Sequence, residues 1–146
     1  MKEAKTVYKV RKVSDIHDEF VVENIAGEEE LHLTVDIVIE DVLARYNRLR
    51  RLLVEAQEKL RQDPNCSECQ EYYGTIFVEI LKIVFGENGA AQLLENYENK
   101  YERLLSDVAP FIVDVINPQM EAAMKARAEK YRRLNKAAKP KRWPFA

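Results

Sequence analysis

The stretch YYGTIFVEILKIVFGENGAAQLL, residues 72–94, is the most apolar part of the chain and holds three of its four glycines. Its apolar positions 73, 76, 77, 80, 81 and 84 follow helical spacing. Gly86 stands where the apolar run stops, and glycine is the usual residue just beyond a helix end because it accepts positive φ without a Cβ clash. Asn88 can cap a second helix, which we expect from Gly89 to about Asn96. This stretch predicts a buried core helix, a stop and a short second helix.

The residues before this stretch change from strand-like to helix-like patterning. Residues 31–37 alternate apolar and polar side chains, which predicts a half-buried strand, and Phe20–Ile25 is rich in β-formers. Residues 27–30 would form the hairpin loop, and Thr6–Val13 is either a short strand or an extended arm. We expect a two- or three-stranded antiparallel element within residues 5–37. A lone hairpin is marginal in water, so this element should pack on the helices or pair with another copy.

A helical stripe follows from Ile39 to Leu60, opposite a charged face. This helix should begin near Asp36–Glu40 and end near Gln62, because Pro64 forces the preceding residue out of the helical region. The core helix should then open at Ser67, which with Gln70 has the form of a capping box.

A further amphipathic pattern extends from Tyr97 to Val115 and contains Pro110. Proline lacks the N–H that a helix interior requires, so we expect a kink or break near Asp107–Ala109. Pro118 predicts a second boundary, with a last helix from Gln119 to about Lys136.

These elements predict a mainly α fold with a small N-terminal antiparallel β element and a bundle of about four to five helices. With 146 residues and a 47% apolar fraction, we expect one domain over residues 1–137 and a short tail over 138–146. The chain has no apolar run long enough to predict a membrane-spanning helix, and its N-terminus does not lead into the apolar segment of a secretory signal. We therefore expect a cytoplasmic protein.

Charge is distributed unevenly along the chain. Between residues 125 and 142 there are nine Lys or Arg and one Glu, a net charge of +8, so the remainder must carry −10 to give the total of −2. Such a tail suits an anionic partner, the acidic body of the same chain or a neighbouring copy. Nucleic acid is one candidate, bound through Arg127, Lys130, Arg132, Arg133, Lys141 and Arg142, with Trp143 and Phe145 stacking on bases. The alternative is an aromatic hook that docks on another subunit.

The residues that usually carry chemistry lack the partners they need. Cys66 and Cys69 form a CxxC, but no alternating β/α pattern surrounds it and no further zinc ligands have a matching spacing, which favours two ordinary thiols. His17 is expected in an exposed turn beside carboxylates, and His32 on the polar face of a strand. The segment Gly86–Gly89 lacks the Lys-Ser/Thr pair of a phosphate-binding loop. We expect no enzyme activity, no metal and no cofactor.

Three segments within residues 31–116 carry a family resemblance. They are Ala44-Arg45-Tyr46, Phe85-Gly86-Glu87-Asn88-Gly89 with Ala91, and Tyr101-Glu102-Arg103-Leu104. A β element, an Arg-Tyr helix, an aromatic helix ending in Phe-Gly-Glu-x-Gly and an amphipathic helix, in this order, resemble the tail assembly chaperone-like proteins of Gram-positive tailed phages and prophages. The resemblance implies a non-enzymatic protein that binds the extended tape-measure protein while tail-tube subunits assemble around it. The basic tail lies outside the resemblance.

The excess of amphipathic surface agrees with such a role, because three long stripes leave room for a groove that accepts a partner helix. We expect the groove on the inner faces of residues 42–60, 73–85 and 97–115, with a tape-measure-like or tail-tube protein as partner, and homo-oligomers as an option. The predicted contact residues are Tyr46, Leu49, Leu53, Phe77, Leu81, Tyr101, Leu105, Trp143 and Phe145.

Overall fold

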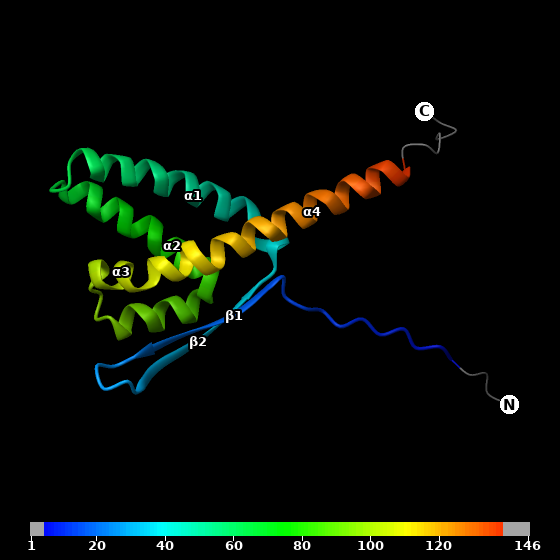
Figure 1. Cartoon of the computed structure of the whole chain (residues 1–146), viewed down its shortest axis with the longest axis horizontal. Helices are drawn as coiled ribbons and strands as arrows, with labels where there is room; N and C mark the ends of the chain where they lie inside the picture. The colour runs from blue at the N-terminus through cyan, green and yellow to red at the C-terminus, as the bar shows by residue number, and fades with distance from the viewer. Residues whose placement is uncertain (1–4, 139–146) are drawn as a thin grey trace.

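A computed structural model describes residues 5–138 of the chain (Figure 1). The fold is mainly helical, with an N-terminal two-stranded antiparallel hairpin followed by helices. The elements are β1 (Ile16–Glu23), β2 (Glu29–Ile37), α1 (Ile39–Gln62), α2 (Ser67–Asn96), α3 (Tyr101–Phe111), a π-helical turn (Ile112–Ile116) and α4 (Asn117–Ala138). Since α3, the π turn and α4 are continuous, they form one long, bent helix, called the long helix below. The described residues therefore contain three helices: α1, α2 and the long helix. The expected bundle of four to five helices is therefore wrong.

The hairpin pairs Ile16 with Ile37 and Phe20 with Leu33. Its inner face is apolar because Leu33, Val35 and Ile37 alternate into the core, as the period of two predicted. The first strand begins at Ile16, earlier than the predicted Phe20, and residues 6–13 form no strand. The turn contains Gly27 at φ +82°, a conformation that suits glycine.

Helix α1 has the predicted bounds, and its start is held by the hairpin. The backbone N–H of Ile39 donates to Asp15 Oδ2 at 2.7 Å, so a residue just before β1 caps the first turn of α1. The helix ends at Gln62, immediately before the turn that contains Pro64. Strand, junction and helix are thus tied together within a few residues.

The start of α2 differs from the predicted capping box by one residue. Cys66, and not Ser67, is the N-cap, and its Sγ accepts the N–H of Cys69 at 3.1 Å. Gln70 does not reach back to the cap: its Nε2 donates to the carbonyl of Pro64 at 2.9 Å. The short Pro64–Cys66 turn brings the Pro64 carbonyl within reach of that side chain, which the Ser-x-x-Gln pattern does not reveal.

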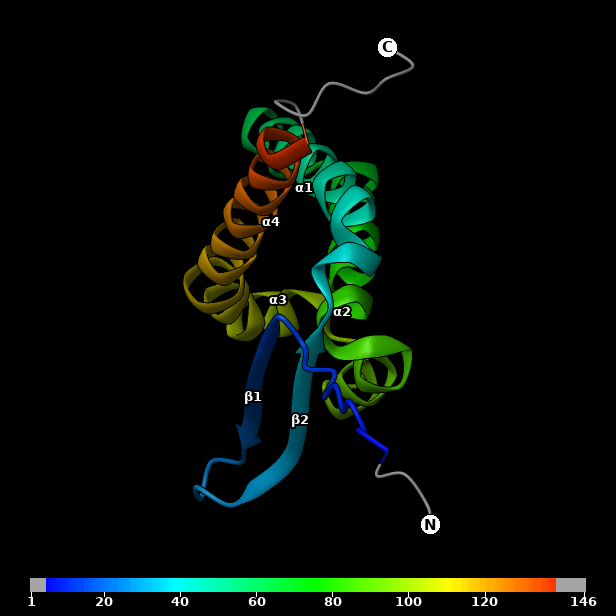
Figure 2. The ribbon, with the colours of Figure 1, turned by 90° about the vertical axis from the view of Figure 1, so that its right-hand side faces the viewer.

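The predicted stop at Gly86 appears as a sharp bend inside α2. Gly86 has φ +79° and ψ 169°, which is not helical, and the chain resumes helical hydrogen bonding beyond it to Asn96. The segment after the bend turns back beneath the first part of α2, toward the hairpin (Figures 1 and 2). A Cβ on Gly89 would lie 2.9 Å from Phe85 Cβ, so Gly89 allows the two sides of the bend to approach closely.

The kink or break expected near Asp107–Ala109 occurs as a π turn a few residues later, at Ile112–Ile116, and the boundary expected at Pro118 is wrong because the helix does not end there. The helix continues through both prolines, with the π turn between them. A π turn widens the backbone, and such bulges are a known cause of helix bends. The N–H of Asn117 bonds to the carbonyl of Ile112, five residues earlier, so the widening lies directly before Pro118.

The core lies where the hairpin, α2 and the long helix meet. Phe20, Phe85 and Phe111 form a cluster with ring centroids 5.0 to 6.0 Å apart. On the other side of the core the buried Tyr46 of α1 hydrogen-bonds through its hydroxyl to the side chain of Asn117. These contacts join the bend of α2 and the bend of the long helix to the hairpin and to α1.

Candidate partner-binding groove

A groove of about 700 Å³ lies where the end of α1, the first half of α2 and the start of α3 come together. Its lining includes Leu60 of α1, Tyr73 and Gly74 of α2, and Tyr101 and Leu105 of α3. A smaller hollow of about 290 Å³ shares Gly74 and Tyr101 and extends to Val78 and Glu79. The two hollows form one groove along α2.

The bend of α2 positions this groove. Because the chain reverses after Gly86, α3 begins beside the N-terminal half of α2 (Figure 1). Tyr101 is 50% exposed, Leu105 is half-buried against the core, and Gly74 offers no side chain. A Cβ on Gly74 would meet no atom within 4 Å, so the helix surface is open at this point.

The groove is long enough for a helical ligand. It follows α2 from Ser67 to Glu79, which corresponds to about 18 Å at 1.5 Å per residue, or more than three helical turns. Glu71 and Glu102 lie on opposite sides of it and are exposed. A helix with an apolar stripe and flanking basic residues would match an apolar floor with an acidic rim.

The structure separates the predicted contact residues into four groups. Leu53 is half-buried, while Tyr101 and Leu105 line the groove together. Trp143 and Phe145 lie outside the described residues. The remaining four, Tyr46, Leu49, Phe77 and Leu81, are at most 5% exposed and belong to the hydrophobic core. A partner would reach these four only if the helices separated.

The predicted contact residues did not include Leu60, Gly74 and Glu102, which lie within the predicted groove segments, or Glu71, which lies outside them. A signal was present at Gly74, because glycine inside a helix costs about 1 kcal/mol relative to alanine and often has a packing or binding reason. The other three occupy ordinary helical positions. Their convergence depends on the bend of α2, which no local pattern at those positions reveals.

The basic C-terminal part of α4 extends beyond the helical body (Figure 1). Arg132 and Arg133 are 75% and 80% exposed at the side chain, and both pair with Glu129. Lys130 is exposed, and the half-buried Arg127 lies 5.2 Å from the ring centroid of Tyr131. The predicted nucleic-acid contacts Lys141 and Arg142 lie outside the described residues.

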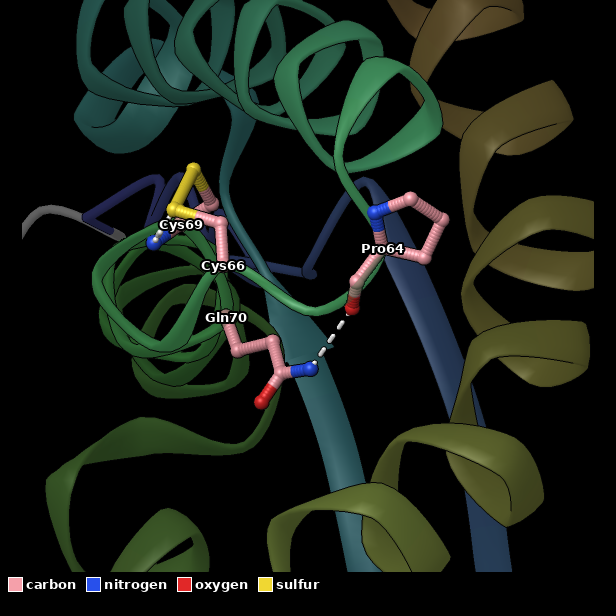
Figure 3. Close-up of a disulfide and its surroundings, with 4 residues drawn as sticks. All are labelled: Pro64, Cys66, Cys69 and Gln70. Carbon is pink, nitrogen blue, oxygen red and sulfur yellow. Dashed lines mark hydrogen bonds between the residues drawn. A yellow bond between two sulfur atoms is a disulfide. The ribbon is translucent and has the colours of Figure 1, made fainter.

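Cys66 and Cys69 are joined in a disulfide at the N-terminus of α2 (Figure 3). The expectation of two ordinary thiols is therefore wrong for this structure. Their spacing around one helical turn brings the two Cα atoms to 5.2 Å, within the usual range for a disulfide. The bridge spans the N-cap and the first turn of α2, directly after the turn that joins α1 to α2.

His17 lies on the exposed outer face of β1, and not in a turn as predicted. Its Nδ1 is 2.5 Å from Asp36 Oδ1, and this contact raises the pKa of His17 and lowers that of Asp36. The Ser14 hydroxyl also donates to Asp36 Oδ1, at 3.2 Å. Because this serine bonds to the carboxylate and not to the imidazole, the three residues do not form a nucleophile–base pair. His32 is also on the outer face, near Glu19 and Glu29.

Within residues 5–138, no helix is long and apolar enough to cross a membrane. The same residues contain no group of three His, Cys, Asp or Glu side chains arranged to hold a metal ion. Comparisons with protein-family models, with curated protein sequences and with solved structures found no match.

Proposed function

We propose that this chain is a non-enzymatic phage or prophage structural-module protein that binds an extended, helical, tape-measure-like protein during tail assembly. The groove along α2 is the docking site, and the host cytoplasm is where the complex forms. The groove is the observation that carries the proposal, because its length, apolar floor and acidic rim suit an amphipathic helix. The order of elements along residues 31–116, which resembles tail assembly chaperones, supplies the class of partner.

A partner of this kind needs to be protected until the tail tube surrounds it. An isolated tape-measure helix exposes its apolar stripe, which promotes aggregation. The half-buried Leu105 and the exposed ring of Tyr101 would cover that stripe, while Glu71 and Glu102 would meet flanking lysines or arginines. Binding by this mode requires no rearrangement of the core.

The test is co-expression with a tape-measure-like coiled-coil protein, measured as the soluble fraction and as co-purification. Gly74→Leu fills the groove, and because a Cβ at Gly74 meets no atom within 4 Å the fold should accept it. Its matched control is Asn47→Leu on the exposed face of α1, away from the groove. We expect Gly74→Leu to abolish co-purification and Asn47→Leu to leave it unchanged.

A second pair compares two exposed tyrosines, Tyr101 in the groove and Tyr72 outside it, which are 50% and 41% exposed. Tyr101→Ala should weaken retention roughly tenfold or more, since buried aromatic anchors contribute about 2 kcal/mol at interfaces. Tyr72→Ala should have little effect. Equal retention by all four variants would show that the groove is not the docking site, and no retention by the wild-type chain would reject the proposed function.

The runner-up is a nucleic-acid-binding or DNA-packaging accessory protein, and the specific observation in its favour is the extended basic part of α4. Lys130, Arg132 and Arg133 are exposed there. This function predicts binding to random duplex DNA that weakens steeply with salt and is lost when residues 125–146 are removed. A third role is a virion component that docks through its C-terminal tail. This role predicts that the full-length chain does not bind DNA and that the same truncation abolishes its incorporation into particles.

A further inference from the structure

An extended arm precedes the hairpin and leads away from the helical body (Figure 1). Residues 5–14 have no secondary structure, and Val7, Tyr8, Val10 and Val13 are each at least 71% exposed. Valine and tyrosine are strand-forming residues, and four large apolar side chains in ten residues are unusual for a solvated linker. The arm has the composition of a strand without the neighbour that a strand requires.

The base of the arm is fixed, which prevents it from folding back on its own hairpin. Asp15 donates its N–H to the carbonyl of Ile37 at 2.8 Å and accepts the N–H of Ile39 through Oδ2. Ser14 is bonded to Asp36. The chain bends at Asp15 between the arm and β1, and the arm is directed away from β1 (Figures 1 and 2). Laying the arm beside its own β1 would require a different conformation at residues 14–15 and would break these contacts.

The hairpin offers an acceptor edge for such a strand. Helix α2 packs along β2, whereas β1 is contacted mainly by β2 and by the start of α4. In the described part of the chain, β1 pairs with β2 alone, so the backbone groups along its other edge have no strand partner. An unpaired edge of this kind is a template for addition of another strand.

We propose that the arm, residues 5–13, of one copy adds as a third strand to the outer edge of β1 in a second copy. The lengths match: the eight residues of β1 span about 26 Å and the nine-residue arm about 30 Å, at 3.3 Å per residue. The partner is a second copy of this chain because each copy carries both the donor and the acceptor, and because their charges are complementary.

The arm is cationic and the hairpin is acidic. The arm, residues 5–13, contains four basic side chains and no acidic one. The exposed outer face of the hairpin contains the carboxylates of Glu19, Glu23, Glu30 and Asp36. Attraction between an arm and a hairpin of different copies therefore favours self-association, and it weakens as salt screens the charges.

The central part of the arm, residues 8–11, also matches the two faces of β1, whereas Val7 and Val13 share the face of the cations and Lys12 the opposite face. On a strand, Lys9 and Arg11 share one face, and Tyr8 and Val10 share the other, because side chains alternate. The outer face of β1 bears Glu19 and Glu23, four residues apart, while its inner face carries Phe20 and Val22 together with the half-buried Asp18. A third strand would place its cations beside the carboxylates and extend the apolar face with Tyr8 and Val10.

The experiment measures the mass of the full chain by size-exclusion chromatography with light scattering. We expect a multiple of the 17.0 kDa monomer at low salt. Reversing the arm charges, Lys9→Glu with Arg11→Glu, should give a monomer, and so should Glu19→Lys with Glu23→Lys. Combining all four substitutions in one chain should restore the oligomer, because the attraction is re-created with opposite signs.

Matched controls carry the same changes of charge elsewhere. Arg132→Glu with Arg133→Glu reverses two exposed cations on α4, and Glu55→Lys with Glu58→Lys reverses two exposed acids on α1; neither should alter the mass. Circular dichroism confirms that every variant is folded. A monomeric wild-type chain overturns the proposal, as does an oligomer that both reversals leave intact or that the fourfold variant fails to restore.

Discussion

The bend at Gly86 determines where α3 begins, so replacing this glycine tests the whole arrangement. Its φ of +79° and ψ of 169° lie in a region open almost only to glycine. A side chain there costs on the order of 1–3 kcal/mol. Alanine also lowers the entropy of the unfolded chain, which returns about 0.4–1 kcal/mol. We therefore expect Gly86→Ala to lower the free energy of unfolding by about 1–2 kcal/mol.

This cost arises from the backbone alone, because a Cβ at Gly86 would meet no atom within 4 Å. Gly89 provides the contrasting case: its Cβ would lie 2.9 Å from that of Phe85, so Gly89→Ala forces the two sides of the bend apart. Overpacking of this kind costs about 1–3 kcal/mol. Gly74 is the control, since it is helical and unobstructed, and Gly74→Ala should stabilise the chain by about 0.5–1 kcal/mol.

Urea unfolding followed by far-ultraviolet circular dichroism measures all three variants against the wild type. We expect a higher midpoint for Gly74→Ala, lower midpoints for Gly86→Ala and Gly89→Ala, and a common slope with denaturant, because the surface exposed on unfolding is unchanged. If Gly86→Ala raised the midpoint as much as Gly74→Ala, Gly86 would be helical, and the bend and the groove built on it would not exist.

The remaining predictions concern the contacts that hold the elements together. Asp36 raises the pKa of His17, so the stabilisation of the hairpin by the protonated imidazole is complete below the unfolded His pKa of 6.5 and is lost as pH rises through the folded His17 pKa. The pKa of Asp36 is lowered, so the stabilisation by its carboxylate is present above the unfolded Asp pKa of 3.8 and is lost as pH falls through the folded Asp36 pKa. An NMR titration should show the His17 pKa above 6.5 in the wild type and near 6.5 in Asp36→Asn; an unchanged pKa would contradict the contact. Reduction of the Cys66–Cys69 disulfide should lower the free energy of unfolding by at most about 2 kcal/mol, since the closed loop is short. In urea, Cys66→Ser should unfold like the reduced wild type because serine is a good N-cap, whereas Cys66→Ala should lower the free energy of unfolding by about 1 kcal/mol more. Tyr46→Phe removes the hydroxyl contact with the start of α4 and should lower the unfolding free energy by about 1 kcal/mol with unchanged far-ultraviolet dichroism; no loss would argue against that hydrogen bond.

Local patterns predicted those elements whose cause is local. Period-two alternation located β2, and helical spacing with Pro64 located the end of α1. Gly86 was found because a positive φ has a distinct sequence signature. The cap at Cys66 was missed because Ser67 is the better cap by propensity, and the geometry of the preceding turn decides which residue takes the position.

The candidate site was less predictable, because an amphipathic stripe identifies the buried face of a helix without saying what covers it. Tyr46, Phe77 and Leu81 belong to such stripes and were expected to contact a partner, but other helices of the same chain cover them. Tyr101 and Leu105 belong to a similar stripe and lie in the groove. The difference depends on which helices pack together, and therefore on the bend of α2.

The two prolines of the long helix show why a local rule can fail when a longer pattern opposes it. Five buried side chains occur at intervals of four residues, through both prolines, and each is at most 6% exposed: Leu104, Val108, Ile112, Ile116 and Met120. In a straight α-helix with 3.6 residues per turn, each interval of four rotates the side chain by about 40°, so the five would spread over about 160°. The π turn at Ile112–Ile116 has a wider repeat and removes part of that rotation, which keeps the stripe facing one core. Since burying one such side chain contributes about 1.5–3 kcal/mol, the stripe together outweighs the roughly 3 kcal/mol that an interior proline costs. The regular interval of four, continued past Pro110 and Pro118, is therefore the sequence feature that indicates one bent helix.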